Sequence, residues 1–163
     1  MIDDNELYLP IKDIKPGMLV KTYLHGYKKV IIKGKSELVN GPFDSIYKLY
    51  KMSKYTNSQL IEDLYITGIH SILVDELSEE QKLKISKYWK TFLQIDDKYL
   101  LMACVCDDFE QTNDYEICDV YQLVLEHKKS NGRYGIWANG ILSETMSLNT
   151  FNTKNRFSSV EKI

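Results

Sequence analysis

The stretch LYITGIHSILVDEL, Leu64 to Leu77, holds two apolar segments separated by a Thr-Gly-Ile-His step. Residues such as Tyr, Ile and Val are typical of strands, and the glycine of the step indicates a turn. The sequence therefore predicts two strands that meet at a turn carrying the hydroxyl of Thr67 and the imidazole of His70. Both side chains are candidates for chemistry, and a turn that merely satisfies its own hydrogen bonds is the alternative.

Short strands are predicted on both sides of this stretch. Turn signals such as His25-Gly26 and Asn139-Gly140 separate apolar segments at intervals of roughly ten residues. The predicted strands are Met18–Tyr23, Tyr27–Lys33, Ser45–Met52, Tyr99–Val105, Ile117–Leu125, Tyr134–Ala138 and Ile141–Leu142. We expect two hairpins, one across His25-Gly26 and one in which residues 128–132 join the strands on either side of them.

Only one helix is predicted, after the second strand of the central stretch. Ser78 suits an N-cap and Gln81 is placed to complete a capping box. Leu83, Ile85 and Trp89 then form a modest apolar stripe, which Phe92 extends. Many short strands and one helix predict an all-β fold. We expect residues 1–150 to form the domain and residues 151–163 to be a loosely held polar tail.

Composition excludes several classes of protein. The 163 residues include 21 Lys and Arg against 23 Asp and Glu, so the net charge of −2 predicts no nucleic-acid or anionic membrane partner. No apolar run approaches the roughly 20 residues of a membrane span, and the start does not resemble a signal peptide, which predicts a cytoplasmic protein. Cys104, Cys106 and Cys118 lack zinc-ligand spacing, so they predict buried strand residues, and we expect neither metal nor cofactor.

Three stretches, in order along the chain, resemble the Hint domains of hedgehog autoprocessing segments and inteins. Thr67-Gly-Ile-His70 is similar to the T-x-x-H motif of that family. LPIKDIKPGMLV, Leu9 to Val20, is similar to a stretch near the start of Hint domains. VYQLVLE, from Val120, and YGIWANGIL, from Tyr134, resemble the paired C-terminal strands of inteins. Taken together, these stretches also resemble the autoprocessing Hint segments of large DNA virus and bacterial proteins.

The resemblance implies a flattened β-horseshoe whose pseudo-twofold halves surround a reaction centre. In such domains a Cys or Ser attacks the preceding carbonyl and converts an amide into a thioester or ester. Thr67 would bind the scissile peptide, and His70 would act on its nitrogen and then protonate it. The implied partner is the domain's own N-terminal flanking polypeptide, or an N-terminal strand that supplies the nucleophile.

The chain also departs from the family pattern. No Cys or Ser stands near its start, and Gln122 occupies a position where inteins often carry a catalytic Asp. Glu144 and Thr145 stand where the final His and Asn of inteins would be, so we expect no splicing. We read Asn139 as a turn residue, and His25 and His127 as solvent-facing. A fragment or inactive copy of a self-cleaving domain and a non-catalytic module with the same fold therefore both stay open; a homing nuclease is disfavoured.

Overall fold

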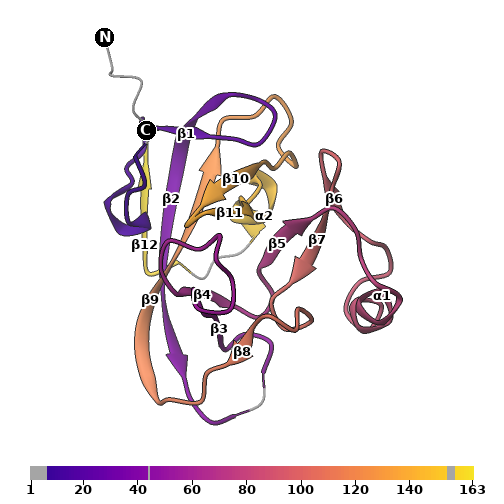
Figure 1. Cartoon of the computed structure of the whole chain (residues 1–163). Helices are drawn as coiled ribbons and strands as arrows, with labels where there is room; N and C mark the ends of the chain where they lie inside the picture. The colour runs from indigo at the N-terminus through magenta and orange to yellow at the C-terminus, as the bar shows by residue number, and fades with distance from the viewer. Residues whose placement is uncertain (1–6, 44, 154–156) are drawn as a thin grey trace.

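The computed structural model describes residues 7–43, 45–153 and 157–163, and strands dominate the fold (Figure 1). The strands are β1 (Leu19–Lys21), β2 (Tyr27–Asn40), β3 (Leu49–Met52), β4 (Leu64–Thr67), β5 (Ser71–Val74), β6 (Gln94–Ile95), β7 (Lys98–Met102), β8 (Glu110–Gln111), β9 (Glu116–Leu125), β10 (Gly135–Ala138), β11 (Ile141–Glu144) and β12 (Ser159–Lys162). The helices are α1 (Glu79–Ile85), α2 (Leu148–Thr153) and a 3-10 turn at Ile11–Asp13. The predicted all-β character is confirmed.

The longest pairing of the fold is the antiparallel ladder between β2 and β9. It runs from Val30 opposite Leu125 to Asn40 opposite Glu116, with a register shift after Val30. Two predictions about these strands are therefore wrong. The strand that begins at Tyr27 does not end at Lys33 but continues through Gly34 to Asn40. The hairpin expected across residues 128–132 does not form, because β9 pairs with β2 and β10 pairs with β11.

A close approach of aromatic rings explains why a glycine lies inside β2. A Cβ atom built on Gly34 would lie 2.5 Å from Phe157 Cδ1 and 3.0 Å from Phe151 Cε2. Glycine leaves room for both rings against the strand, so here it marks close packing and does not break the strand.

The second sheet has the strand order β10-β11-β5-β7-β6 and carries much of the core. Asn139 and Gly140 turn β10 into β11 with φ angles of 52° and 89°, as their sequence predicts. Buried side chains that this sheet contributes to the core include Ile72 from β5 and Leu101 and Met102 from β7. An isolated bridge between Thr22 and Ile136 joins this sheet to the end of β1.

The third sheet, in the order β4-β3-β8, is tied to the end of β2 by a buried asparagine. The Asn40 side chain is fully buried; its Oδ1 accepts from Leu49 N at 3.0 Å and its Nδ2 donates to Thr112 Oγ1 at 3.0 Å. Because a buried amide left unpaired is costly, these bonds fix β3 and the residue that follows β8 relative to the end of β2.

The predicted helix forms, with its capping box. Ser78 Oγ accepts from Gln81 N and the Gln81 side chain accepts from Ser78 N. The helix ends at Ile85, and Ile85 is buried whereas Leu83 is 68% exposed, so the expected apolar stripe is only partly correct. The structure also has a second helix, α2, that the sequence did not predict.

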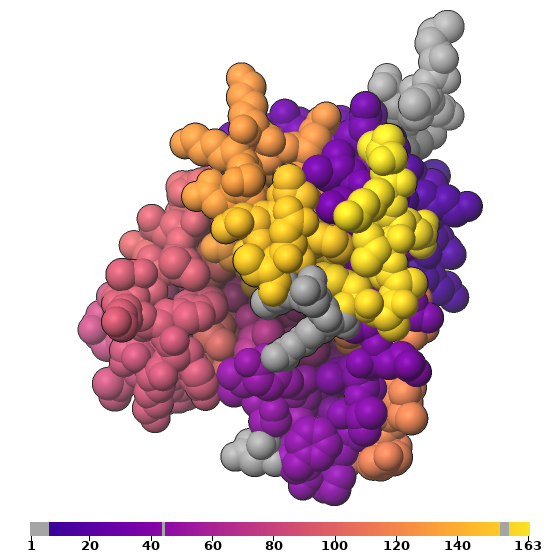
Figure 2. Space-filling model, turned by 180° about the vertical axis from the view of Figure 1, so that it is seen from behind, coloured from indigo at the N-terminus to yellow at the C-terminus, as the bar shows by residue number. Residues whose placement is uncertain are grey.

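The segment expected to be a loosely held tail contributes to the fold. Phe151 is buried in α2 and stacks on Phe157 with a ring-centroid distance of 4.5 Å. The strand β12 pairs with β2, and the buried Lys33 Nζ lies 2.8 Å from a carboxylate oxygen of Glu161. Figure 2 shows this yellow C-terminal segment lying against the indigo start of the chain. Residues 154–156 of that segment, like residues 1–6, lie outside the described part.

None of the helices in the described ranges has the length and apolar character needed to cross a bilayer.

Phe151→Ala should lower the free energy of unfolding by about 3 kcal/mol, because it leaves a cavity against β2. Val160→Ala, at a side chain that is 42% exposed in β12, is the matched control and should change it by less than about 0.5 kcal/mol. Urea denaturation measures both values. Equal small effects would mean that α2 does not stabilise the domain.

Candidate functional site

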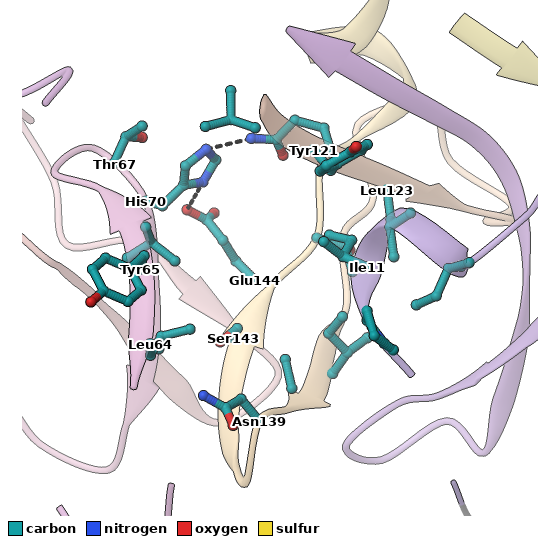
Figure 3. A pocket seen from close by; sticks show the side chains of 18 of the residues that line it. Ile11, Leu64, Tyr65, Thr67, His70, Tyr121, Leu123, Asn139, Ser143 and Glu144 are labelled. Carbon is teal, nitrogen blue, oxygen red and sulfur yellow. Dashed lines mark hydrogen bonds and ion pairs between the residues drawn. The ribbon is translucent and has the colours of Figure 1, made fainter. Parts of the chain in front are cut away.

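A broad groove of about 2310 Å³ opens between the third sheet and the β2–β9 ladder. We call the groove the hollow lined by residues 7–11, by β4, by residues 118–123 of β9 and by the turn between β10 and β11. Figure 3 shows Thr67 and His70 on one side of it and Ile11 and Leu123 on the other. The two predicted site residues therefore lie on one wall, across from the start of the described chain.

His70 contacts polar side chains from two other strands. The side-chain amide of Gln122, on β9, donates to His70 Nε2, and His70 Nδ1 lies 3.8 Å from Glu144 Oε1, on β11 (Figure 3). Glu144 is held in turn by Arg133, whose Nη1 donates to Oε2 at 2.8 Å, and by Ser71 N, which donates to Oε1 at 3.0 Å. These groups form the His70 cluster: His70, Gln122, Glu144 and Arg133.

The tight turn between β4 and β5 puts the imidazole in place. His70 N donates to Thr67 O at 2.9 Å, and Cys104 N donates to Gly68 O at 3.0 Å. A Cβ atom on Gly68 would lie 2.6 Å from Ile46 O, so only glycine fits. Because Thr67 is buried and both ends of the turn are bonded, His70 projects from a fixed backbone.

The His70 cluster has the composition of an acid–base site. Donation from the Gln122 amide leaves Nε2 as an acceptor, so the ring proton lies on Nδ1 and faces the Glu144 carboxylate. An imidazole with one protonated and one free ring nitrogen can accept a proton at one atom and donate a proton from the other. Arg133 compensates the Glu144 charge, and that compensation allows the carboxylate to be largely buried.

The sequence predicts Thr67 and His70 as site residues and treats Gln122 as a departure from the family pattern, and it indicates no role for Glu144 or Arg133 in the cluster. Glu144 was noted only as the residue at the position of the last intein histidine. Its side chain reaches His70 because Ser143 pairs with Ile72, which brings β11 alongside β5. That pairing joins segments far apart in the chain, so no local sequence pattern predicts it.

Asn139 does more than permit a turn. Its Nδ2 donates to Glu62 O at 2.8 Å and its Oδ1 accepts from Glu62 N at 3.0 Å. A Cβ atom on Gly140 would lie 1.9 Å from Gln59 O, so the loop before β4 packs directly on this turn. We call this contact the Asn139 clamp; it holds the start of β4 against the β10–β11 hairpin.

The remaining candidates stay apart from the His70 cluster. His25 and His127 are exposed, as predicted, and their rings pack on Tyr134. Cys118 lines the groove, and burial raises the pKa of its thiol above the ordinary value. Burial likewise raises the pKa of Cys104 and Cys106. A protonated thiol is a weak nucleophile, so none of the three is activated at neutral pH.

Comparisons with protein-family models, with curated proteins and with solved structures each give no match. Among the described residues, no group of three or more His, Cys, Asp or Glu side chains is arranged to hold a metal ion.

Glu144→Ala should lower the free energy of unfolding by about 2 kcal/mol, because Ser71 N loses its acceptor and Arg133 its counter-ion. Glu144→Gln keeps an oxygen for Ser71 N and should cost about half as much. Urea denaturation of the two variants separates the hydrogen bond from the charge. A loss below about 0.5 kcal/mol for Glu144→Ala would contradict the role given to this carboxylate.

The raised thiol pKa values predict a stability that declines in alkaline solution. Each thiol ionises at lower pH in the unfolded chain than in the folded one, so its contribution is complete below about pH 8.5 and is lost as pH rises through the folded pKa. Urea denaturation under reducing conditions between about pH 7 and 10 measures this decline. A variant with Cys104→Ala, Cys106→Ala and Cys118→Ala should decline less steeply; an equal slope would assign the effect to other groups.

Proposed function

We propose that this chain is the body of a Hint-type self-processing domain that acts on a peptide bond of a flanking polypeptide segment. The observation that carries the proposal is the position of His70 on the groove wall, with Thr67 beside it and residues 7–11 across from it. The order of the similar stretches and the β-rich fold add support. On this proposal the sheets form a Hint-like horseshoe, and the groove is the opening between its two halves.

The proposed reaction is an N-to-S or N-to-O acyl shift followed by cleavage. The sulfur or oxygen of a Cys or Ser in the segment attacks the preceding carbonyl carbon and forms a C–S or C–O bond. The C–N bond breaks, and the proton given up by the thiol or hydroxyl ends on the departing amine. Water or an added thiol then attacks the thioester or ester, releases the acyl fragment, and returns the side chain to its free form.

His70 would move the proton in this sequence. Because the amide resonance opposes attack, the leaving nitrogen must be protonated as the C–N bond breaks. An imidazole whose proton sits on Nδ1 has Nε2 free to receive the thiol proton once the segment displaces the Gln122 amide. Glu144 stabilises the imidazolium that results. Thr67, by resemblance, would bind the scissile peptide.

The nucleophile comes from outside the sequence that precedes β2. Residues 1–26 and the strand that follows contain neither Cys nor Ser before Ser36. The proposal therefore takes the nucleophile from a flanking segment in the same polypeptide or from a strand supplied in trans. The Gln122 amide orients the His70 ring but is uncharged, whereas the Asp that many inteins carry at this position would place a negative charge beside the ring.

A non-catalytic peptide-binding module is the second candidate. It is favoured by the surroundings of the His70 ring, because Nε2 already accepts from the Gln122 amide and Nδ1 lies 3.8 Å from the Glu144 carboxylate. In that case the groove would bind an extended polypeptide and leave its amide bonds intact.

A fusion protein tests the catalytic proposal. A reporter domain is joined through a designed strand headed by cysteine to residue 7, and the purified fusion is incubated with dithiothreitol. We expect release of the reporter, which gel electrophoresis and mass spectrometry detect. His70→Ala should slow release by about a hundredfold, because general acid catalysis is lost.

Two controls accompany this experiment. His127→Ala removes an exposed imidazole that is not part of the His70 cluster and should leave the rate unchanged. Cysteine-to-alanine substitution in the designed strand should abolish release. Equal rates with and without His70, or no release at all, would refute self-cleavage and leave the binding module.

A further inference from the structure

We propose that the flanking segment binds in the groove as an added β-strand along the outer edge of β4, held by the backbone of Tyr65 and Thr67. The identity of the segment rests on the proposed function, whereas the docking mode rests on hydrogen-bonding geometry. Binding through the backbone makes the segment's extended conformation, more than its side chains, the basis of recognition.

The direction of the backbone groups in β4 follows from its ladder with β3. Leu49 faces Thr67 and Tyr50 faces Ile66, and Gly68 N donates to Lys48 O at 3.0 Å in the same register. In an antiparallel pair the hydrogen-bonded positions alternate. Gly68 and Ile66 therefore bond toward β3, whereas the N–H and C=O groups of Tyr65 and Thr67 point to the opposite side.

Most of these outward groups have no partner in the described part of the chain. Thr67 O accepts from His70 N within the turn. No hydrogen bond is formed there by Tyr65 N, Tyr65 O or Thr67 N. An unpaired strand edge is a template for another strand.

The edge of β4 faces the groove. All residues from Ile61 to Thr67 line it without a gap. Since side chains alternate between the two faces of a strand, a strand presenting one face would contribute only every second residue. All four residues of β4 line the groove, as expected where the backbone edge of the strand faces it.

On the opposite wall, part of the edge of β9 has no backbone partner among the residues that the structure describes. Met146 N donates to Leu123 O at 3.0 Å, so Leu123 bonds away from β2, and by alternation Tyr121 and Asp119 point the same way. The run from Cys118 to Leu123 also lines the groove without a gap. An extended chain in the groove therefore meets backbone donors and acceptors on both sides.

Shape and charge specify the occupant. Residues of both edges line the same groove, and the groove volume of about 2310 Å³ is large enough for an extended chain of several residues. Acidic side chains outnumber basic ones among the lining residues, and Glu62, Asp114 and Glu116 lie along the two edges or beside them. The partner that fits is thus an extended polypeptide segment bearing basic side chains.

Amide hydrogen exchange tests the docking mode independently of catalysis. The fusion described above is used with alanine in place of the nucleophile, valine and lysine alternating in the designed strand, and NMR detection. Relative to residues 1–163 alone, exchange at Tyr65 N and Thr67 N should slow by at least about tenfold. Ile66 N and Gly68 N, already bonded to β3, serve as internal references.

A proline substitution supplies the matched variant. Among the backbone hydrogen-bonding groups, Tyr65→Pro removes only an outward donor, which an edge strand tolerates, and it should reduce the protection at Thr67 N about fivefold; Tyr65→Ala, which loses the same ring contact with Lys51 but keeps the donor, is its reference. Ile66→Pro removes a ladder donor and should destabilise the fold itself. Unchanged exchange at Tyr65 N and Thr67 N on adding the segment would overturn the docking mode.

The two proposals fail in different ways. Reporter release by the cysteine-headed fusion without protection of the β4 edge would keep self-cleavage and overturn strand addition. Protection of the edge without release would keep strand addition and overturn self-cleavage.

Discussion

The antiparallel ladder between β2 and β9 sets the position of the groups on the far wall of the groove. Gln122 lies opposite Gly34 in this ladder, and its side chain reaches His70 from there. Because side chains alternate, a slip of one residue would turn Gln122 away and present Tyr121 or Leu123 to the imidazole. The same segment of β2 pairs with β12 on its other edge. The C-terminal part of the chain therefore stabilises the strand whose pairing with β9 sets the position of Gln122.

Local signals in the sequence predicted local structure well. The capping box at Ser78, the turn at Asn139-Gly140 and the turn at His25-Gly26 each depend on a few adjacent residues, and each forms as expected. Pairing between distant strands was predicted poorly. The apolar pattern of Ile117–Leu125 fits a hairpin with the next strand as well as it fits a ladder with β2, and only tertiary packing distinguishes the two.

The candidate site likewise contains residues that a local motif indicates and residues that only the pairing of distant strands brings in. Thr67 and His70 share one short turn, so a motif could indicate them. Glu144 joins His70 only through the pairing of β11 with β5, and Arg133 joins only through Glu144. The polar C-terminal segment shows no apolar period and so predicts a loose tail, yet the rings of Phe151 and Phe157 fill the space that Gly34 leaves free.

The Asn139 clamp has a consequence for the order in which the domain is built. Asn139 and Glu62 are 77 residues apart, and β9 must return to β2 before the opposite wall exists. Contacts of such high sequence separation are entropically late events in folding. On the ribosome, β4 is therefore synthesised well before the Asn139 turn that holds the loop in front of it. The groove can form completely only after the β10–β11 hairpin has been synthesised.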